Sequence, residues 1–588
     1  MTEANADRKL SRRQFVGTAA AGAMALGAVS LAPGVGAART VAGAAVQDEP
    51  TSTPSTWSYT ADVVIVGYGG AGAVAAITAN NLGANVLVLE KTPLVNRATP
   101  TGLTIRGGGG NSSVCAGGVG YPINPTTGAE ALFQACWGAT PMDVCLALCT
   151  VASQVPAWLQ AMKIPHANPT VSTTFGEYPG ITQPLNCITG SSSLTNGCPG
   201  GFSAIDGVVA GLNIPILWNT SATHLIQNPT TNEVLGVQAL QNQSVVLNVQ
   251  AKRAVILTCG GYEYNEQMKL DYLPCYPVRF EGWQYDTGDG ITMAAEVGAG
   301  MWHMNHQAGT YDMWFPDYNM AWGCTPSGFG WFIVDKYGNR YVNEEVSPFS
   351  GHGCAAWMGQ FDPTVPEYTR IPSFMIFDSK TFAAGPIGRS VGITYLGVPG
   401  ASLGGAAWPG NSAALAKGWI IEGATSPSDL ANAINQAAIA TVPTMATLSQ
   451  IGQKMVPAIQ GPAGKIQIKA NPSMLTATVN KWNADCAAGN GDTVFGRTAA
   501  QMAPVSTPPF YAVPLFPGSY NTHGGPIHDA QWRVCDFNNN PIPRLYEAGE
   551  LGGEQAFLYV VAVSDIPAYI ATGQIAGNNA AMEAPWTT

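Results

Sequence analysis

The segment that most constrains the fold is ADVVIVGYGGAGAVAAITANNLGANVLVLEK, residues 61–91. Residues 62–66 form a short apolar run typical of a buried strand, and residues 71–82 have the composition of a helix. A second apolar run, 86–89, follows and ends at an acidic residue. This order of strand, glycine-rich turn, helix and strand predicts a dinucleotide-binding unit.

Three glycines and one acid of this unit each have a physical purpose. Gly67 allows a tight turn, Gly69 lets the backbone approach a pyrophosphate, and Gly72 lets the helix pack closely on the strand. The helix N-terminus then faces the anion. Glu90 follows about 20 residues later, where an acid can bind ribose hydroxyls. A glycine loop that binds nothing is the alternative, and the correctly spaced acid argues against it.

A second glycine-rich segment, RGGGGNSSVCAGGVGYP at 106–122, suits a backbone packed against a flat ring and its phosphates. With it, the chain resembles the flavoprotein subunits of the fumarate reductase/succinate dehydrogenase superfamily, in the branch of the 3-ketosteroid dehydrogenases and exported single-chain flavin reductases. Further motifs carry the resemblance in the family's order: AVILTCGGYEYN at 254–265, TGDG at 287–290, DKYGNRYVNE at 335–344 and PIPRLYEAGELGG at 541–553.

The resemblance implies FAD as the cofactor, and we expect it to be bound without a covalent link. The expected fold is α/β, with a split Rossmann-like FAD-binding domain and an inserted α+β capping domain for the substrate. The glycine pattern and the resemblance together predict cofactor contacts at Gly67, Gly69, Gly70, Ala71, Gly72, Glu90, Lys91, Gly109, Gly110, Asn111, Ser112, Ser113, Ala116, Gly117, Gly118, Thr258, Gly260, Gly261, Asp289, Gly524 and Glu550.

The predicted domain boundaries follow the same motifs. We expect a twin-arginine signal peptide at 1–38, a linker at 39–57, the first part of the FAD-binding domain at 58–300, the capping domain at 301–503 and the second part of the FAD-binding domain at 504–588. Within the cap, residues 424–445 and 472–489 have helical composition. In the first part of the FAD-binding domain, residues 228–255 are typical of β-hairpins.

The leader carries paired arginines, Arg12 and Arg13, ahead of a weakly apolar run. This pattern predicts export of an already folded, FAD-loaded chain to the periplasm or the exterior of the cell envelope. A retained anchor is the alternative, since the run is short and rich in alanine and glycine. No later segment is expected to be long and apolar enough to span a membrane.

The substrate side departs from the family's fumarate reductases. Those enzymes carry His-Pro-Thr after the TGDG turn, an arginine just past VNE and a late His-Thr-Met-Gly-Gly. Here the arginine falls at or near Pro348, and Asn521 stands in place of the late histidine. Between Glu281 and Asp335 the sequence has no Lys or Arg. A dicarboxylate substrate is therefore not expected.

The same stretch is rich in aromatic residues, which favours a bulky apolar substrate. Part of this set is expected to pack in the core and part to line a pocket beside the flavin. The aromatic residues are Trp283, Tyr285, Trp302, Tyr311, Trp314, Phe315, Tyr318, Trp322, Phe329, Trp331 and Phe332.

Two protein groups are needed for hydride chemistry beside a carbonyl: one to polarise the carbonyl and one to handle a proton. The resemblance to ketosteroid enzymes assigns the first role to Tyr559. Their proton-handling tyrosine is replaced here by Phe349, so His352, Tyr318 and Tyr311 are the candidates for the second role.

Composition excludes other classes of partner and site. The formal net charge is −11 with no basic tract after the leader, so nucleic-acid binding is not expected. The 12 cysteines form no CxxC pair, which gives no support for a metal site. Most are expected to be buried free thiols, although disulfide pairing cannot be read from their spacing.

The sequence therefore predicts an exported FAD-dependent oxidoreductase that reduces or introduces a C=C bond beside a carbonyl of a steroid-like or aromatic substrate. Because no haem motif or second flavin domain is present in the sequence, a separate cytochrome, quinone or similar electron carrier is expected. The alternatives are a fumarate-, urocanate- or acrylate-type enoate reductase for small acids, and an exported flavin- or ligand-binding protein without turnover.

Overall fold

The computed structural model describes residues 53–98, 104–115, 117–172, 189–315, 320–324, 326–345, 352–388, 408–439, 468–557, 559–560 and 563–586. The predicted leader, the first part of the linker, Ala116, Tyr318 and Phe349 lie outside the described residues.

The first sheet is built around parallel strands. Its order is β25-β26-β11-β1-β2-β8, and β10 pairs with both β11 and β9. β11, β1, β2, β8 and β26 run parallel, whereas β9, β10 and β25 join in antiparallel fashion. The bounds are β1 (Tyr59–Val66), β2 (Val86–Leu89), β8 (Ile216–Leu217), β9 (Thr220–Gln227), β10 (Val234–Gln241), β11 (Val245–Leu257), β25 (Arg533–Cys535) and β26 (Pro541–Glu547).

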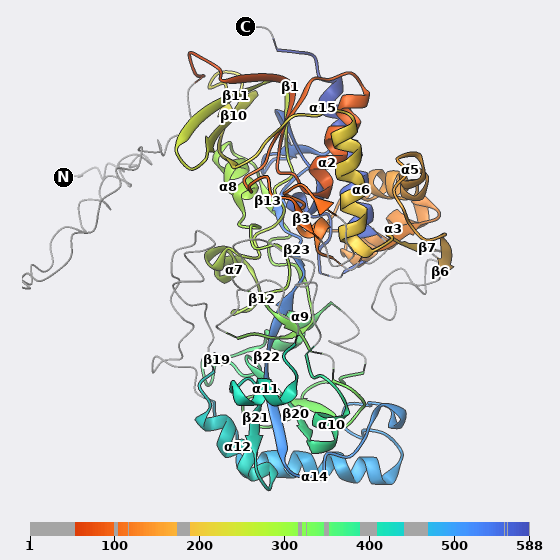
Figure 1. The fold of residues 1–588 in the computed structure, drawn as a ribbon, viewed down its shortest axis with the longest axis vertical. Coiled ribbons are helices and arrows are strands. Elements are labelled where there is room, and N and C mark those ends of the chain that lie inside the picture. The colour runs from red at the N-terminus through yellow and green to blue at the C-terminus, as the bar shows by residue number, and fades with distance from the viewer. Residues whose placement is uncertain are drawn as a thin grey trace, which may run out of the picture. The chain divides into compact units, whose positions relative to one another are not determined.

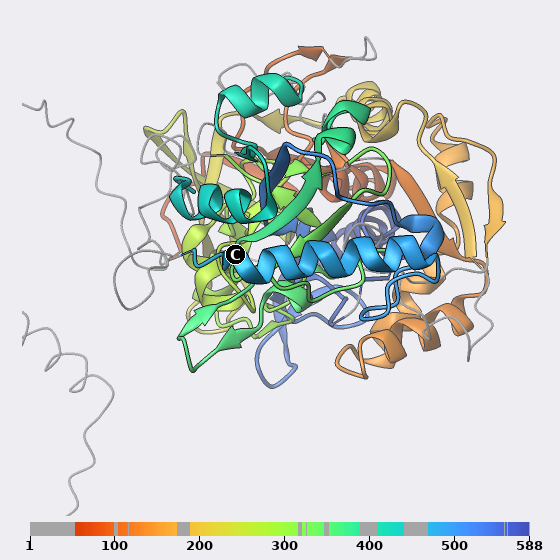
Figure 2. The same cartoon turned by 90° about the horizontal axis from the view of Figure 1, so that it is seen from below.

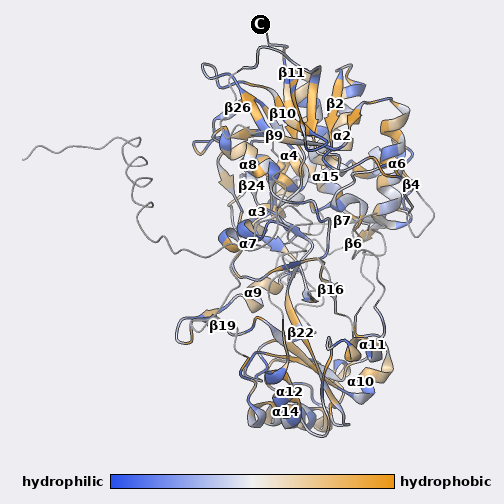
Figure 3. Cartoon of the chain, turned by 60° about the vertical axis from the view of Figure 1, so that its left-hand side comes forward, coloured by the Kyte–Doolittle hydropathy of each residue, from blue (hydrophilic) through white to orange (hydrophobic). Residues whose placement is uncertain are grey.

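Helices cover this sheet on the side where α2 (Gly70–Asn81) and α15 (Ile566–Met582) pack against each other, with α6 (Gly197–Gly211) beside α2 (Figure 1). The central strands are apolar along most of their length (Figure 3), because both of their faces are covered. Three further helices pack on α15 or on one another: α3 (Pro125–Ala135), α4 (Met142–Ala152) and α5 (Val155–Ala161).

A second, mainly antiparallel sheet has the order β16-β15-β22-β20-β17, and β12 and β21 pair with β22. Its strands are β12 (Arg279–Phe280), β15 (Tyr311–Met313), β16 (Trp322–Gly323), β17 (Trp331–Val334), β20 (Ser373–Asp378), β21 (Ile421–Gly423) and β22 (Phe510–Ser519). α12 (Pro427–Gln436) and α14 (Pro472–Ala488) pack on it (Figure 2), where Leu475 and Trp482 join the core.

Short elements connect the two sheets and complete the fold. They are β3 (Arg97–Ala98), β4 (Thr104–Ile105), η1 (Asn111–Ser113), β5 (Gly118–Pro122), β6 (Thr170–Ser172), β7 (Thr189–Ser193), α7 (Glu266–Tyr272), α8 (Asp289–Glu296), β13 (Met301–Trp302), β14 (Gln307–Ala308), α9 (Cys354–Met358), β18 (Phe361–Asp362), β19 (Glu367–Tyr368), α10 (Ser379–Ala384), α11 (Asn411–Ala416), η3 (Ala499–Gln501), β23 (Asn521–Thr522), β24 (Gly525–Pro526) and η4 (Gly549–Gly552).

The predicted α/β class and the strand–helix–strand unit are confirmed by β1, α2 and β2. The predicted hairpin segment, 228–255, contains the antiparallel pair β10 and β11, and β9 precedes it. The predicted helices at 424–445 and 472–489 contain α12 and α14, and residues 440–445 lie outside the described residues. Both helices begin as their sequences indicate: the side chains of Ser426 and Asn471 accept hydrogen bonds from N–H groups of the first turn. β22 lies in the second sheet although it falls within 504–588, and the predicted domain boundaries stay predictions.

One described stretch, Met142–Ala161, is long and apolar enough to cross a membrane by length and composition. The expectation that no segment after the leader is long and apolar enough to span a membrane is therefore wrong. The stretch comprises α4 and α5, and its apolar residues include Val144, Leu148 and Leu159, which are buried in the protein core.

The glycine turn after β1 leaves no room for side chains. A Cβ on Gly72 would lie 2.2 Å from the carbonyl oxygen of Gly67, and a Cβ on Gly67 would lie 2.5 Å from that of Thr258. Gly67 also has a φ of +101°, which other residues rarely adopt. The turn therefore holds α2 close to β1 and β11.

We expect Gly72→Ala to lower the free energy of unfolding by about 2–3 kcal/mol, because the backbone must move to admit the methyl group. Gly207→Ala in α6 is the matched control. A Cβ there meets nothing within 4 Å, and alanine favours the helix by about 0.5–1 kcal/mol. Denaturant unfolding of both variants measures the effect, and equal stabilities would contradict the close approach of α2 to β1.

Candidate functional site

A cavity opens where the parallel strands of the first sheet end. We call it the edge cavity. Its wall includes the residues that follow β1, β2, β11 and β26, namely Gly67, Glu90, Thr258 and Ala548. It encloses about 1280 Å³, counting space open to solvent. Ligand sites of open α/β sheets lie at this edge.

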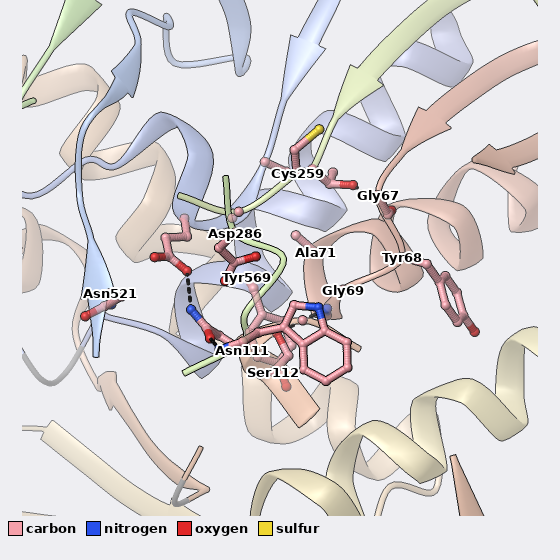
Figure 4. Close-up of a pocket in the computed structure, with 18 of the residues that line it drawn as sticks. Gly67, Tyr68, Gly69, Ala71, Asn111, Ser112, Cys259, Asp286, Asn521 and Tyr569 are labelled. Atoms are coloured by element: carbon pink, nitrogen blue, oxygen red, sulfur yellow. Dashed lines mark hydrogen bonds between the residues drawn. The ribbon is translucent and has the colours of Figure 1, made fainter. Parts of the chain in front are cut away.

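Most of the predicted cofactor contacts come together in this wall, several of them visible in Figure 4. Those lining the edge cavity are Gly67, Gly69, Gly70, Ala71, Glu90, Lys91, Gly110, Asn111, Ser112, Thr258, Gly260, Asp289 and Glu550.

Seven predicted contacts do not line the cavity: Gly72, Gly109, Ser113, Gly117, Gly118, Gly261 and Gly524. Gly109, for example, donates its N–H to the Tyr68 carbonyl, and a Cβ on Gly524 would lie 2.3 Å from Met304. Their contact with the cofactor stays a prediction, as does that of Ala116.

The acid after β2 is fixed by the backbone. Glu90 accepts hydrogen bonds from the N–H groups of Tyr68 and Thr92, each at 2.8 Å. Beside it, Lys91 donates to Asp289 at 2.7 Å. Burial would lower the pKa of Lys91, but the charge of Asp289, its hydrogen bond and the charge of Asp286 together outweigh burial and raise that pKa. Lys91 is therefore cationic, with its charge paired inside the wall.

Three carboxyl groups form a cluster at the wall: Asp286 and Glu550 line the cavity, and the buried Glu263 lies next to Glu550. Glu550 accepts a hydrogen bond from Asn111 at 3.0 Å (dashed in Figure 4), and Glu263 accepts from the Thr522 N–H at 2.6 Å. Burial raises the pKa of all three, and their mutual repulsion raises those of Asp286 and Glu550 further. The raised pKa values favour the protonated forms of these carboxyl groups, which can donate hydrogen bonds as well as accept them.

The polar atoms of the wall fit a cofactor such as FAD. Among the described residues, Asp286 Oδ2, His523 Nε2 and the Tyr569 hydroxyl are buried, have no hydrogen-bond partner and belong to residues that line the cavity. Buried polar groups are normally paired. With the N-terminus of α2 opening on the same cavity, these atoms suit the hydroxyls, ring edges and phosphates of a dinucleotide.

A group of histidines lies at and behind the wall: His523 lines the edge cavity, and His303 and His306 lie close to His523. The His306 and His523 rings lie 4.8 Å apart, and His303 contacts the Gly553 carbonyl at 2.8 Å. Burial lowers the pKa of His303 to about 4, that of His306 to about 3 and that of His523 well below its usual value. The cluster is therefore neutral at physiological pH.

The structure brings two predicted catalytic residues close to this group of histidines. The rings of His352 and Tyr559 lie 4.4 Å apart, and the Tyr559 hydroxyl donates to Asp565. Neither residue lines the edge cavity itself, whereas Tyr520, Asn521, His523 and Asp565 do. Sequence reasoning missed Asp565, since a single acid before a helix carries no distinctive pattern.

The third candidate, Tyr311, lies elsewhere. It is fully buried in β15, and its hydroxyl accepts a hydrogen bond from Tyr341 at 3.1 Å. Of the aromatic run, only Trp283 and Tyr285 line the edge cavity among the described residues, and most others pack in the core, for example Phe315 stacked on Trp419 at 4.3 Å.

A disulfide joins Cys115, in the cavity wall, to Cys198 near the start of α6. The spacing of the cysteines did not predict this pair. Nine other described cysteines are free thiols, seven of them buried, as expected. No cluster of His, Cys, Asp and Glu suited to a metal ion occurs in the described part of the chain.

One acid of the wall titrates near neutrality: burial raises the pKa of Glu554 from 4.5 to about 7. Between these values the folded protein keeps a proton that the unfolded chain releases, so stability falls as the pH rises from about 4.5 to 7. We expect Glu554→Gln to remove this decline, which amounts to at most about 3 kcal/mol at about 1.4 kcal/mol per pKa unit.

Unfolding free energies of the wild type and the variant at several pH values between 4.5 and 8 measure the difference. Glu130→Gln, at a partly exposed position of α3, is the control and should keep the wild-type slope. Parallel curves for the wild type and Glu554→Gln would show that this carboxyl does not titrate in that range.

Comparison with known proteins agrees with this geometry. Residues 62–556 match the FAD binding domain family. Digoxin reductase of Eggerthella lenta is 25% identical over 640 residues, which cover 99% of this chain and 98% of that protein. NADH:fumarate oxidoreductase of Klebsiella pneumoniae is 25% identical over 558 residues, covering 89% of this chain but 48% of that protein, so this chain spans about half its length.

Among solved structures, 3-ketosteroid delta1-dehydrogenase from Sterolibacterium denitrificans, in complex with 1,4-androstadiene-3,17-dione, superposes with a TM-score of 0.67 at 20% identity, covering 89% of this chain and 99% of that one. This likeness establishes the fold. The chain belongs to the FAD binding domain family and is an FAD-dependent oxidoreductase acting on CH–CH groups.

Proposed function

We propose that this protein reduces or introduces a C=C bond next to a carbonyl in a bulky, apolar, steroid-like or aromatic compound. The chemistry that FAD supplies when bound is hydride transfer at its N5 atom. We further propose that FAD is held without a covalent link, and that a separate cytochrome, quinone or similar carrier exchanges electrons with it. The twin-arginine leader supports export to the periplasm or cell-envelope exterior.

The charge of the edge cavity carries the substrate assignment. Lys91 is the only Lys or Arg among the described residues that line it, and its ammonium is paired with Asp289. The histidines at and behind the wall are neutral, because burial lowers their pKa values. A small dicarboxylate would lose its hydration there without gaining a cationic partner.

The wall offers neutral hydrogen-bonding groups instead. Tyr520, Asn521 and His523 can contact a carbonyl, and the ring of Trp283 supplies apolar surface in the same cavity. The names of two similar proteins, digoxin reductase and 3-ketosteroid delta1-dehydrogenase, support a bulky substrate.

Anaerobic mixing of the chemically reduced holoprotein with a panel of steroid enones, cinnamates, fumarate and urocanate tests this proposal. We expect steroid-like or aromatic enones to reoxidise the flavin at least about 100-fold faster than fumarate, because each missing charge-assisted hydrogen bond costs about 1.5–3 kcal/mol. Absorbance at the flavin band follows the reaction.

Faster reoxidation by fumarate or urocanate would instead identify a small-acid enoate reductase. If no compound reoxidises the flavin, the reverse reaction is assayed with saturated ketones and an artificial electron acceptor. Absence of turnover in both directions would identify a flavin-binding protein without this activity.

A further inference from the structure

The residue before α15 has an unusual conformation. Asp565 occupies the N-cap position with φ 52° and ψ −106°, and its side chain makes no capping hydrogen bond. An aspartate at this position normally accepts a hydrogen bond from the N–H groups of the first turn. Non-glycine residues adopt such backbone angles only when their surroundings enforce them, and these positions are enriched in functional sites.

The carboxylate of Asp565 is instead held by two side chains. Its Oδ2 accepts a hydrogen bond from the Tyr559 hydroxyl, and its Oδ1 accepts one from Asn521 Nδ2 at 2.6 Å. The two donors come from different segments, one six residues before Asp565 and the other in β23. Together they fix both oxygens of the carboxylate in one orientation.

Asp565 and Asn521 belong to the wall of the edge cavity, together with Tyr520 and His523. Tyr559 does not line the cavity. It is buried, and its ring packs against His352. The Asp565 carboxylate therefore lies at the cavity, and the Tyr559 side chain lies behind this carboxylate. This order differs from the one predicted from the sequence, in which Tyr559 contacts the substrate.

We propose that Asp565 is the group that exchanges a proton with the substrate carbon, and that Tyr559 and Asn521 are its positioning residues. This inference rests on the proposed function, and it supplies the proton-handling group that Phe349 cannot provide.

In the reductive direction, Asp565 gives the proton on its carboxyl group to the carbon next to the carbonyl. The electron pair of the C=C bond would form this new C–H bond, and FAD in its reduced form, when bound, would supply the hydride that the neighbouring carbon takes up and would be left oxidised. The carboxylate that remains is stabilised by the Tyr559 and Asn521 donors and regains its proton from water. Dehydrogenation runs through the same atoms in reverse.

Several titratable groups of the described residues lie around the carboxylate. Tyr559 contacts it directly, and His352, His523 and Tyr520 line or back the adjoining wall. Tyr569, one turn into α15, has its pKa raised by burial and by the charge of Asp565. The pH profile of wild-type turnover therefore contains one limb that depends on the protonation of Asp565.

Asp565→Asn is the test, measured on the FAD-loaded enzyme with the fastest enone of the panel. Asparagine keeps the shape of aspartate and can still accept from Tyr559, but it has no proton to exchange. We expect the variant to retain FAD and to lose about 10²–10⁴ of the reoxidation rate, the usual contribution of a general acid. The limb of the pH profile should also disappear. Asp143→Asn, at an exposed position in the first turn of α4, is the control and should keep the wild-type reoxidation rate and the limb of the pH profile.

Tyr559→Phe and Asn521→Leu test the positioning roles. Each keeps the carboxylate and removes one donor, so the pH limb should persist but shift toward higher pH, because the ionised carboxylate is less stabilised. Should Asp565→Asn fail to fold, an unshifted limb in both of these variants would overturn the proposal.

Infrared difference spectra of the holoenzyme, wild type minus Asp565→Asn, give a readout independent of turnover. A carboxyl band that titrates over the pH range of the limb supports the assignment. Wild-type rate and pH profile in Asp565→Asn would overturn it while leaving the proposed function intact. A wild-type enzyme inactive with every compound in both directions would refute the proposed function, and this inference with it.

Discussion

The parallel pairing of β1 with β11 is the constraint on which the site depends. The two strands are far apart in the sequence, yet Val63–Val66 lie beside Ala254–Leu257 in register, and β11 pairs on its other side with β26. This pairing brings the ends of β1, β11 and β26 to one edge of the sheet. The glycine turn at Gly67 and the segment after β26 can therefore border one cavity.

Sequence reasoning succeeded where the requirement is local and steric. The close approach of Gly72 to the Gly67 carbonyl is a contact within one turn, so strand, turn and helix were predicted directly. It failed where the site is assembled from distant segments. Asp286 and Asp565 line the cavity but belong to no local sequence pattern. The disulfide between Cys115 and Cys198 joins residues 83 positions apart. Tyr311 is buried in the core, which the order of the motifs does not predict.

Burial, and not a lack of ionisable groups, keeps much of the edge cavity neutral. Desolvation raises the pKa values of Glu263, Asp286 and Glu550 and lowers those of His306 and His523. Acids and bases thus both adopt their uncharged forms, and their hydrogen-bonding atoms remain available to a ligand. The proposed selectivity for a neutral substrate would then be a consequence of desolvation, not of any one residue that rejects anions.

The assignments of substrate and proton donor support each other. A fumarate-type site needs cations to hold carboxylates, and a carboxylate poised in the same wall would repel such a substrate each time it gives up its proton. Asn521, which stands where the family's fumarate reductases have a histidine, has an amide that donates to Asp565. The replacement of the histidine by Asn521 thus removes a group that could carry positive charge and supplies an amide that positions the carboxylate of Asp565. The two proposals are thus compatible, because a substrate without charge of its own would not be repelled by the carboxylate of an aspartate that serves as proton donor.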